Sequence, residues 1–112
     1  MLIEVGEVIH VLMRRYFDGQ PKRHFLGKIT QIEGMCVRAR GYTFMTGTSE
    51  PGFRKQDTIG ERLISLHDDS TIVTVMPSGF DVEQATYSMR SGFVVVTDGK
   101  HEAELDETAG LR

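Results

Sequence analysis

Basic and aromatic residues lie close together at several points of the sequence, and side chains of these two kinds could bind an anion. The cations are Arg14, Arg15, Arg23, Arg40, Arg54 and Lys55, and the aromatic residues near them are Tyr16, Tyr42 and Phe53. Guanidinium groups bind carboxylate and phosphate through paired hydrogen bonds, and aromatic rings supply flat apolar contact area. The sequence therefore predicts a site for an anionic or amphipathic small molecule, or for an acidic partner, if the fold brings these residues together.

Other interpretations of the same residues stay open. The cations could form a solvated rim that keeps the β-strands from pairing with other chains. Tyr42 and Phe44 share one face of a strand, since they are two residues apart, and they could be half of a β core or a platform for stacking nucleic-acid bases. Nucleic acid is the less favoured partner, because the 112-residue chain has a net charge of −3.

Residue patterns typical of catalytic and metal sites are absent from the sequence. The histidines are His10, His24, His67 and His101, and none is close enough to another to form a local pair of metal ligands. No serine occurs in a Gly-x-Ser-x-Gly pattern, and Cys36 is the only cysteine. We expect no metal, no cofactor and no catalytic residue. His10 lies in an apolar run and is predicted to be a hydrogen-bonded core residue, with an acid or base in an interior cavity as the alternative.

The composition is that of one small folded domain. Hydrophobic residues make up 39% of the chain and charged residues 26%, and 112 residues suffice for a single core. One cysteine cannot form an intrachain disulfide, which fits a reducing compartment, and every apolar run is shorter than the roughly 18 residues of a membrane span. We expect a cytoplasmic protein without a membrane partner.

Turn residues divide the chain into short apolar runs. Asp18-Gly19, Glu33-Gly34 and Asp98-Gly99 each lie between such runs, and these pairs supply the positive φ angles of tight hairpin turns. The runs at residues 2–13, 25–32, 35–45, 71–76 and 93–97 are rich in β-branched and aromatic residues, which favours strands. Three hairpins are predicted.

Three segments are harder to assign. Residues 59–67 fit a strand by their alternation and a short helix by their capping pattern, and we predict a strand, which makes a fourth hairpin with residues 71–76. Residues 81–85 form at most one helical turn. Residues 46–60 contain Pro51 and several glycines and are predicted to be the longest loop.

The fold class predicted from these patterns is all-β. We expect an antiparallel meander of seven to eight short strands that forms a small barrel or a sandwich, with residues 1–107 as a single domain and residues 108–112 as a frayed tail. Because the connections of a meander alternate between two ends, the cations named above gather at one end. The acidic residues predicted at the other end are Glu4, Glu7, Glu33, Asp68, Asp69, Glu104, Asp106 and Glu107.

Three functions follow from this reading of the sequence. The first is a non-enzymatic binding module whose basic and aromatic end holds the anionic or amphipathic ligand, or the acidic partner. The second is a structural protein that assembles into a homo-oligomer through exposed strand edges. The third is a small barrel enzyme with an interior cavity around His10.

Overall fold

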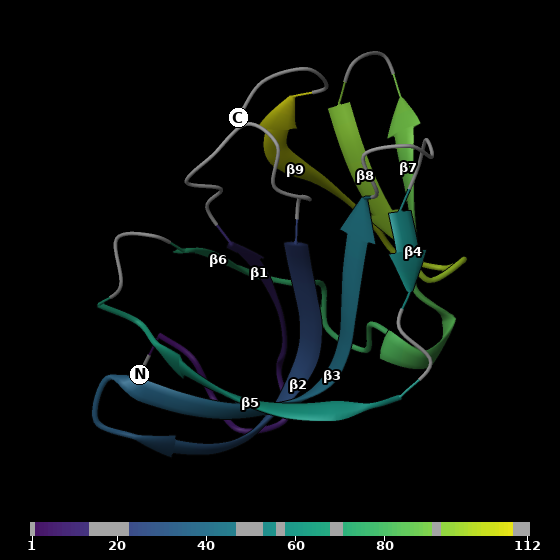
Figure 1. Ribbon diagram of the computed structural model, residues 1–112. Helices are drawn as coiled ribbons and strands as arrows, with labels where there is room; N and C mark the ends of the chain where they lie inside the picture. Colours follow the sequence, from purple (N-terminus) through teal and green to yellow (C-terminus); the bar gives the residue numbers. More distant parts are fainter. Residues whose placement is uncertain are drawn as a thin grey trace.

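The computed structural model describes residues 2–13, 23–46, 53–55, 58–67, 71–90 and 93–108. These residues form two antiparallel β-sheets, with one 3-10 turn before the second sheet (Figure 1). The prediction of an all-β fold is confirmed. The sheets pack against each other and do not close into a barrel.

The larger sheet has six strands. They are β1 (Val8–Met13), β2 (Arg23–Glu33), β3 (Cys36–Thr46), β4 (Phe53–Lys55), β5 (Gly60–Ser65) and β6 (Thr71–Val75). Their order is β4-β3-β2-β1-β6, and β5 pairs with β3 as well. Since β4 and β5 take successive stretches of one edge of β3, they act as one strand with an interruption between them.

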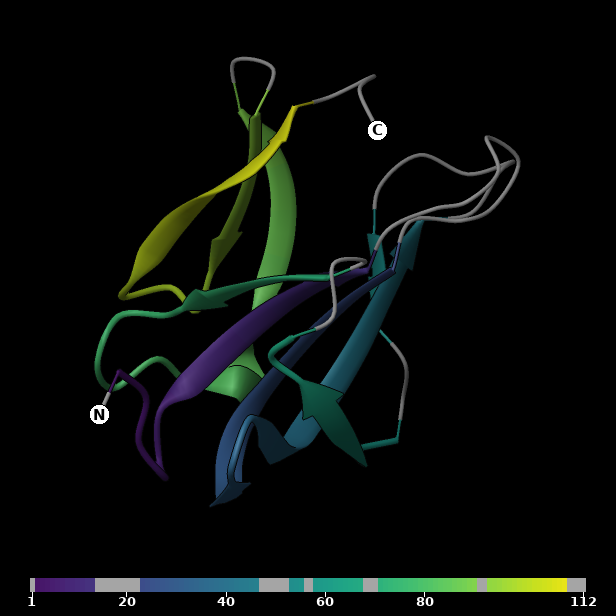
Figure 2. The same ribbon diagram turned by 90° about the vertical axis from the view of Figure 1, so that its left-hand side faces the viewer.

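The smaller sheet has the order β7-β8-β9. Its strands are β7 (Thr86–Arg90), β8 (Phe93–Thr97) and β9 (Glu102–Thr108), and the 3-10 turn η1 (Val82–Gln84) precedes them. The Asp81 carboxylate caps η1 by accepting a hydrogen bond from the backbone N–H of Glu83. The prediction of at most one helical turn at residues 81–85 is therefore confirmed. Figure 2 shows the smaller sheet stacked on one side of the larger one.

Local sequence patterns predicted most strands and two turns correctly. Gly34 and Gly99 have φ angles of +59° and +94°, and they lie in the turns that join β2 to β3 and β8 to β9. Residues 60–65 form a strand, as predicted. The predicted turn at residues 18–19 lies outside the described residues, although β1 and β2 pair as its two arms.

The predicted fourth hairpin is wrong, and the meander is interrupted at this point. β5 pairs with β3 and β6 pairs with β1, so these two consecutive strands lie at opposite edges of the sheet. The packing explains the crossover. Ile64 of β5 and Val73 of β6 reach the same apolar core from its two sides, which a simple hairpin would not allow.

The predicted long loop at residues 46–60 is also different from expectation. Thr46 ends β3, Phe53–Lys55 form β4, and Gly60 begins β5. The other residues of this segment are described only at 58 and 59. Pairing with the long strand β3 supplies the backbone hydrogen bonds that turn part of the segment into a strand.

Each face of the larger sheet has its own apolar core. The larger sheet is curved (Figure 1), and the first core, called the inner core here, lies on its concave face. It consists of Ile9, Val11, Phe25, Ile29, Val37, Ala39 and Ile64. Between the two sheets lie Val8, Leu26, Phe44, Met76, Phe80, Ala85, Val94 and Val96. Alternate residues of β1, β2 and β3 thus face different cores, and both faces are buried at residues 8–11 of β1, 24–27 of β2 and 43–44 of β3.

Three glycines lie side by side in one row across β2, β3 and β5. Gly27 lies opposite Gly41, and Gly41 lies opposite Gly60. A Cβ atom on Gly41 would lie 2.0 Å from the carbonyl oxygen of Leu26, whereas a Cβ atom on Gly60 would meet no atom within 4 Å. Only glycine at position 41 therefore permits the close approach of β3 to β2 that accompanies the curl of the sheet.

Candidate functional site

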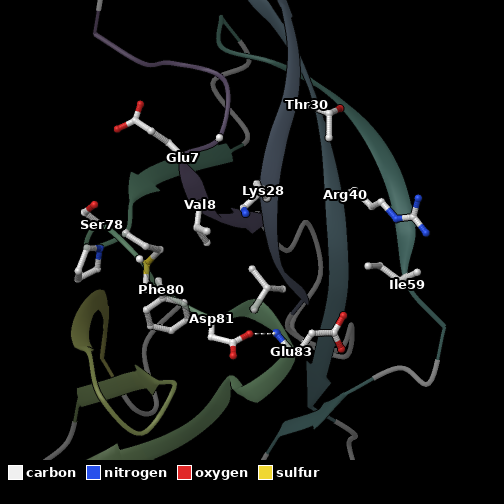
Figure 3. Close-up of a pocket in the computed structure, with 15 residues that line it drawn as sticks. Glu7, Val8, Lys28, Thr30, Arg40, Ile59, Ser78, Phe80, Asp81 and Glu83 are labelled. Atoms are coloured by element: carbon white, nitrogen blue, oxygen red, sulfur yellow. Dashed lines mark hydrogen bonds between the residues drawn. The ribbon is translucent and has the colours of Figure 1, made fainter.

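A cleft of about 620 Å³ lies between the larger sheet and the segment that connects β6 to η1 (Figure 3). Strands β1, β2 and β3 supply Val8, Lys28 and Arg40, and the connecting segment and η1 supply the opposite wall, which includes Phe80 and Val82. A volume of this size accommodates a small organic molecule. Its lining combines apolar side chains with charged side chains, as a site for an amphipathic ligand requires.

Lys28 and Arg40 are direct neighbours on the sheet side of the cleft. Val8 pairs with Lys28, and Lys28 pairs with Arg40, so the three residues lie in one row on the same face. Neither cationic side chain forms a hydrogen bond or a salt bridge with any residue in the described parts of the chain. Two adjacent cations are thus available to a ligand.

Three carboxylates also line the cleft, and each accepts a hydrogen bond from the protein. Glu7 Oε1 accepts from the backbone N–H of Glu4 over 2.6 Å. Asp81 Oδ1 accepts from the backbone N–H of Glu83 over 3.0 Å. Glu83 Oε2 accepts from the hydroxyl of Tyr42 over 2.8 Å. The carboxylates are therefore engaged in holding local structure, in contrast to the two cations.

Tyr42, Lys55 and Glu83 connect the larger sheet to η1 at one end of the cleft. The Lys55 ammonium lies 4.1 Å from the centre of the Tyr42 ring and donates a hydrogen bond to the carbonyl oxygen of Glu83 over 2.9 Å. The hydrogen bond to Glu83 raises the pKa of the Tyr42 hydroxyl, and desolvation and the charge of Glu83 act in the same direction. This cluster fixes η1 against β3 and β4.

Asp98 holds the connecting segment from the other side. Its Oδ2 accepts a hydrogen bond from the backbone N–H of Asp81 over 2.8 Å, and its Oδ1 accepts from the backbone N–H groups of Lys100 and His101. Burial works to raise the pKa of Asp98, but these hydrogen bonds and the one to the His101 ring outweigh it and hold the pKa well below its usual range. The wall of the cleft is thus tied to the β8–β9 turn.

The structure brings together three of the nine residues predicted to bind a ligand. Arg40, Tyr42 and Lys55 lie on the same face of the larger sheet, because Lys55 pairs with Phe44 and residues 40, 42 and 44 alternate along β3. Of these, Arg40 lines the cleft, and Tyr42 and Lys55 support its wall.

Among the other predicted residues, only Arg23 has a described side chain, and it lies apart from this group. Arg23 pairs with Met45, one of the odd-numbered residues of β3, and so it lies on the face opposite to Arg40. Arg54 also pairs with Met45, and Phe53 pairs with Thr46, but only their backbone positions are described. Arg14, Arg15 and Tyr16 lie outside the described residues.

The predicted separation of charge into two ends does not hold at the cleft. Glu7 was expected at the acidic end and Arg40 at the basic end, yet both line the same cleft. The reason is the register: Glu7 precedes Val8, which lies in the same row as Lys28 and Arg40. The prediction assigned each charged residue to one end of the sheet from the direction of its strand. It did not take into account how far along the strand the residue lies.

Sequence reasoning missed Lys28 and the segment at residues 76–83. Lys28 interrupts the buried stretch at residues 24–29 of β2, and this charge among apolar neighbours was the available signal. For the segment, Pro77 and Gly79 indicated a turn, and Gly79 has a φ of +83°. Nothing local showed that this turn covers a cleft.

His10 is buried, as predicted, and it is not among the described residues that line the cleft. Its Nε2 lies 2.8 Å from Nδ1 of His24, and the ring of Tyr87 packs against both imidazoles between the two sheets. The pair is therefore a hydrogen-bonded part of the core. Within the described ranges, no group of three or more His, Cys, Asp or Glu side chains could hold a metal ion.

A second, smaller hollow of about 370 Å³ lies beside the β2–β3 hairpin. Its lining consists of Gln31, Glu33, Cys36, Val37, Arg38 and Leu63. The guanidinium of Arg38 donates a hydrogen bond to Oε1 of Gln31 over 3.2 Å. Because its cation is engaged, this hollow is the weaker candidate for an anion.

Comparison with protein-family models, curated proteins and solved structures finds no match to this chain. The fold and the cleft define an all-β protein of two packed sheets with a small-molecule-sized cleft beside their junction. Among the residues that the structure describes, no helix has the length and apolar character needed to cross a membrane.

Proposed function

We propose that this protein is a non-enzymatic binding module for a small amphipathic molecule that carries a carboxylate or phosphate group. The observation that carries the proposal is the pair Lys28 and Arg40, which are adjacent cations at the cleft without a hydrogen bond or salt bridge from their side chains to any described residue. A ligand anion at the Lys28 ammonium would receive a charge-assisted hydrogen bond, and Arg40 on the next strand adds positive charge to the same face of the sheet, although its side chain points away from Lys28 toward Ile59 (Figure 3).

The apolar part of the ligand would lie against the apolar lining of the cleft, which comes from β1 and from the connecting segment. Val8, Met76 and Phe80 belong to the core between the sheets and line the cleft, although each is at most 5% exposed. Burying an apolar chain there is favourable in proportion to its area, at about 25 cal/mol per Å². The expected orientation puts the charged group toward β2 and β3 and the apolar group toward the connecting segment.

The acidic lining restricts the ligands that fit. Glu7, Asp81 and Glu83 make a purely anionic, highly charged molecule a poor ligand, because its charges would face carboxylates of the same sign. A single anionic group at one end of an apolar body satisfies both sides of the cleft. Nucleic acid, which carries a charge on every phosphate, is disfavoured for the same reason.

Three probes that differ only in their polar end test this proposal. Binding of hexanoate, hexylamine and hexan-1-ol to the native protein is measured by calorimetry at low and at physiological salt. We expect hexanoate to bind more tightly than the other two, and salt to weaken hexanoate most. Equal binding of the three probes, or tightest binding of hexylamine, would overturn the proposal.

A further inference from the structure

The edge strand β6 presents backbone groups that no described strand uses. β6 pairs with β1 only (Figure 2). The backbone N–H of Met76 donates to the carbonyl oxygen of Val8 over 2.8 Å, so the amide of residue 76 points toward β1. Amides alternate in direction along a strand, and those of Ile72 and Thr74 therefore point to β1, whereas those of Val73 and Val75 point away from it.

Apolar side chains are exposed on both faces of this edge. Ile72 is 50% exposed and Val75 is 43% exposed. Ile72 pairs with Leu12 and Val75 with Ile9, so the two side chains lie on opposite faces of the sheet. A flat partner surface would cover only one of them. An added strand would cover both, and it would also bond the outward amides of Val73 and Val75.

β6 differs from the other edge strands in its charge. Its residues Thr71–Val75 include no charged side chain. The edge strands β4, β5, β7 and β9 all contain charged residues, with Lys55 in β4, Glu61 and Arg62 in β5, Arg90 in β7 and Glu102 and Glu104 in β9. Charged residues on an edge strand discourage pairing with another chain. Of the described edges, β6 alone lacks this protection.

We propose that β6 pairs antiparallel with β6 of a second copy of this chain, forming a two-fold symmetric dimer through a continuous sheet. Pairing β6 with one of the charged edge strands would take charged side chains out of water, which costs free energy. Pairing β6 with a second β6 avoids this cost, because neither strand carries a charge. The strand is also compatible with itself: antiparallel pairing about Val73 places Val73 against Val73 and Ile72 against Thr74. Symmetric contacts of this kind use the same surface on both copies.

Hydrogen exchange of the native protein tests the pairing directly. Amide exchange is measured by NMR at a low and a high protein concentration, with sedimentation equilibrium on the same samples. We expect a monomer–dimer equilibrium, with slower exchange of the Val73 and Val75 amides at high concentration and unchanged exchange of the Ile72 and Thr74 amides. A monomer at every concentration overturns the proposal, and so does a dimer in which the Val73 and Val75 amides keep their monomer rates.

Charged variants supply the second arm of the test. Ile72→Lys with Val75→Lys places charges on both faces of the edge and should weaken the dimer by at least about tenfold, because charges would be buried in the new pairing. Leu63→Lys is the matched control, since Leu63 is 72% exposed on β5. All variants are checked for native circular dichroism. Dimerisation that survives the β6 substitutions, or that is lost equally in the control, contradicts the proposal.

Discussion

Lys28 lies directly opposite Arg40 in the pairing of β2 with β3, on the face of the sheet that lines the cleft. Like charges in this relationship repel each other and cost about 0.2–1 kcal/mol. Glu61 lies opposite Arg40 in the pairing of β3 with β5 and offsets a part of this repulsion, although within the described residues no carboxylate forms a salt bridge with either cation. An anion bound in the cleft, as proposed above, would offset the repulsion further, and the stability of the sheet would then depend on occupation of the cleft.

Replacing Lys28 by glutamine should separate stability from binding. Lys28→Gln removes the repulsion with Arg40 and is expected to raise the free energy of unfolding by about 0.2–1 kcal/mol. The same change removes a charged contact and should weaken hexanoate binding by about tenfold. Chemical denaturation and calorimetry check the two effects.

Lys100→Gln is the control for Lys28→Gln, because Lys100 is exposed in the β8–β9 turn and is not among the described residues of the cleft. It removes the same charge and should leave both quantities unchanged within error. If the two variants weaken hexanoate equally, the effect is that of net charge and not of the cleft.

Two glycines of one cross-strand row should differ strongly in their sensitivity to substitution. Gly41→Ala places a Cβ atom 2.0 Å from the carbonyl oxygen of Leu26, and relief requires backbone movement, so we expect destabilisation by at least about 3 kcal/mol. Gly60→Ala meets no atom within 4 Å and should change the stability by no more than about 0.5 kcal/mol. Similar losses in both variants, measured by urea denaturation, would show that the close approach at Gly41 is not the cause.

The hydrogen bond from Tyr42 to Glu83 should be visible in an alkaline titration. Because the pKa of Tyr42 is raised above the ordinary value of 10.0, the folded state keeps this proton where the unfolded state loses it. The bond therefore contributes stability below about pH 10 that is lost as the pH rises through the folded pKa. Glu83→Gln removes the charge and should lower the pKa of Tyr42, read from its ring NMR signals. An unchanged pKa in Glu83→Gln would mean that Glu83 does not hold this proton.

Asp98 should control stability at acid pH. Its pKa is lower in the folded state than in an unfolded chain, so its ionised form stabilises the fold above the unfolded value, and this contribution is lost as the pH falls through the folded value. Asp98→Asn should lower Tm at neutral pH, with a difference from the native protein that shrinks below about pH 4. A Tm difference that does not depend on pH would show that the negative charge of Asp98 does not contribute to stability through the backbone donors around it.

The strands and turns of this fold could be predicted because their signals are local. Glu33-Gly34 and Asp98-Gly99 require the positive φ that their glycines adopt, and β-branched runs become strands. The partners of β5 and β6 could not be predicted in the same way. They depend on which side of the inner core Ile64 and Val73 reach, and no short window of sequence contains that information.

The candidate site could be predicted only in part for a related reason. Arg40, Tyr42 and Lys55 meet because they lie on one face of β3 and its partner β4, whereas Arg23 falls on the opposite face by one step of register. Lys28 faces Arg40 only through the pairing of β2 with β3. The wall of the cleft depends on the bond from Asp81 to Asp98, which are 17 residues apart in the sequence.

Chemical-shift mapping of the native protein with hexanoate tests the central claim most directly, because it locates the binding site without any substitution. We predict saturable shifts of the amide signals of Lys28, Gly79 and Val82, which come from the two sides of the cleft. Shifts that do not saturate, or that gather at Cys36, Arg38 and Leu63 in the smaller hollow, would contradict the assignment of the cleft as the ligand site.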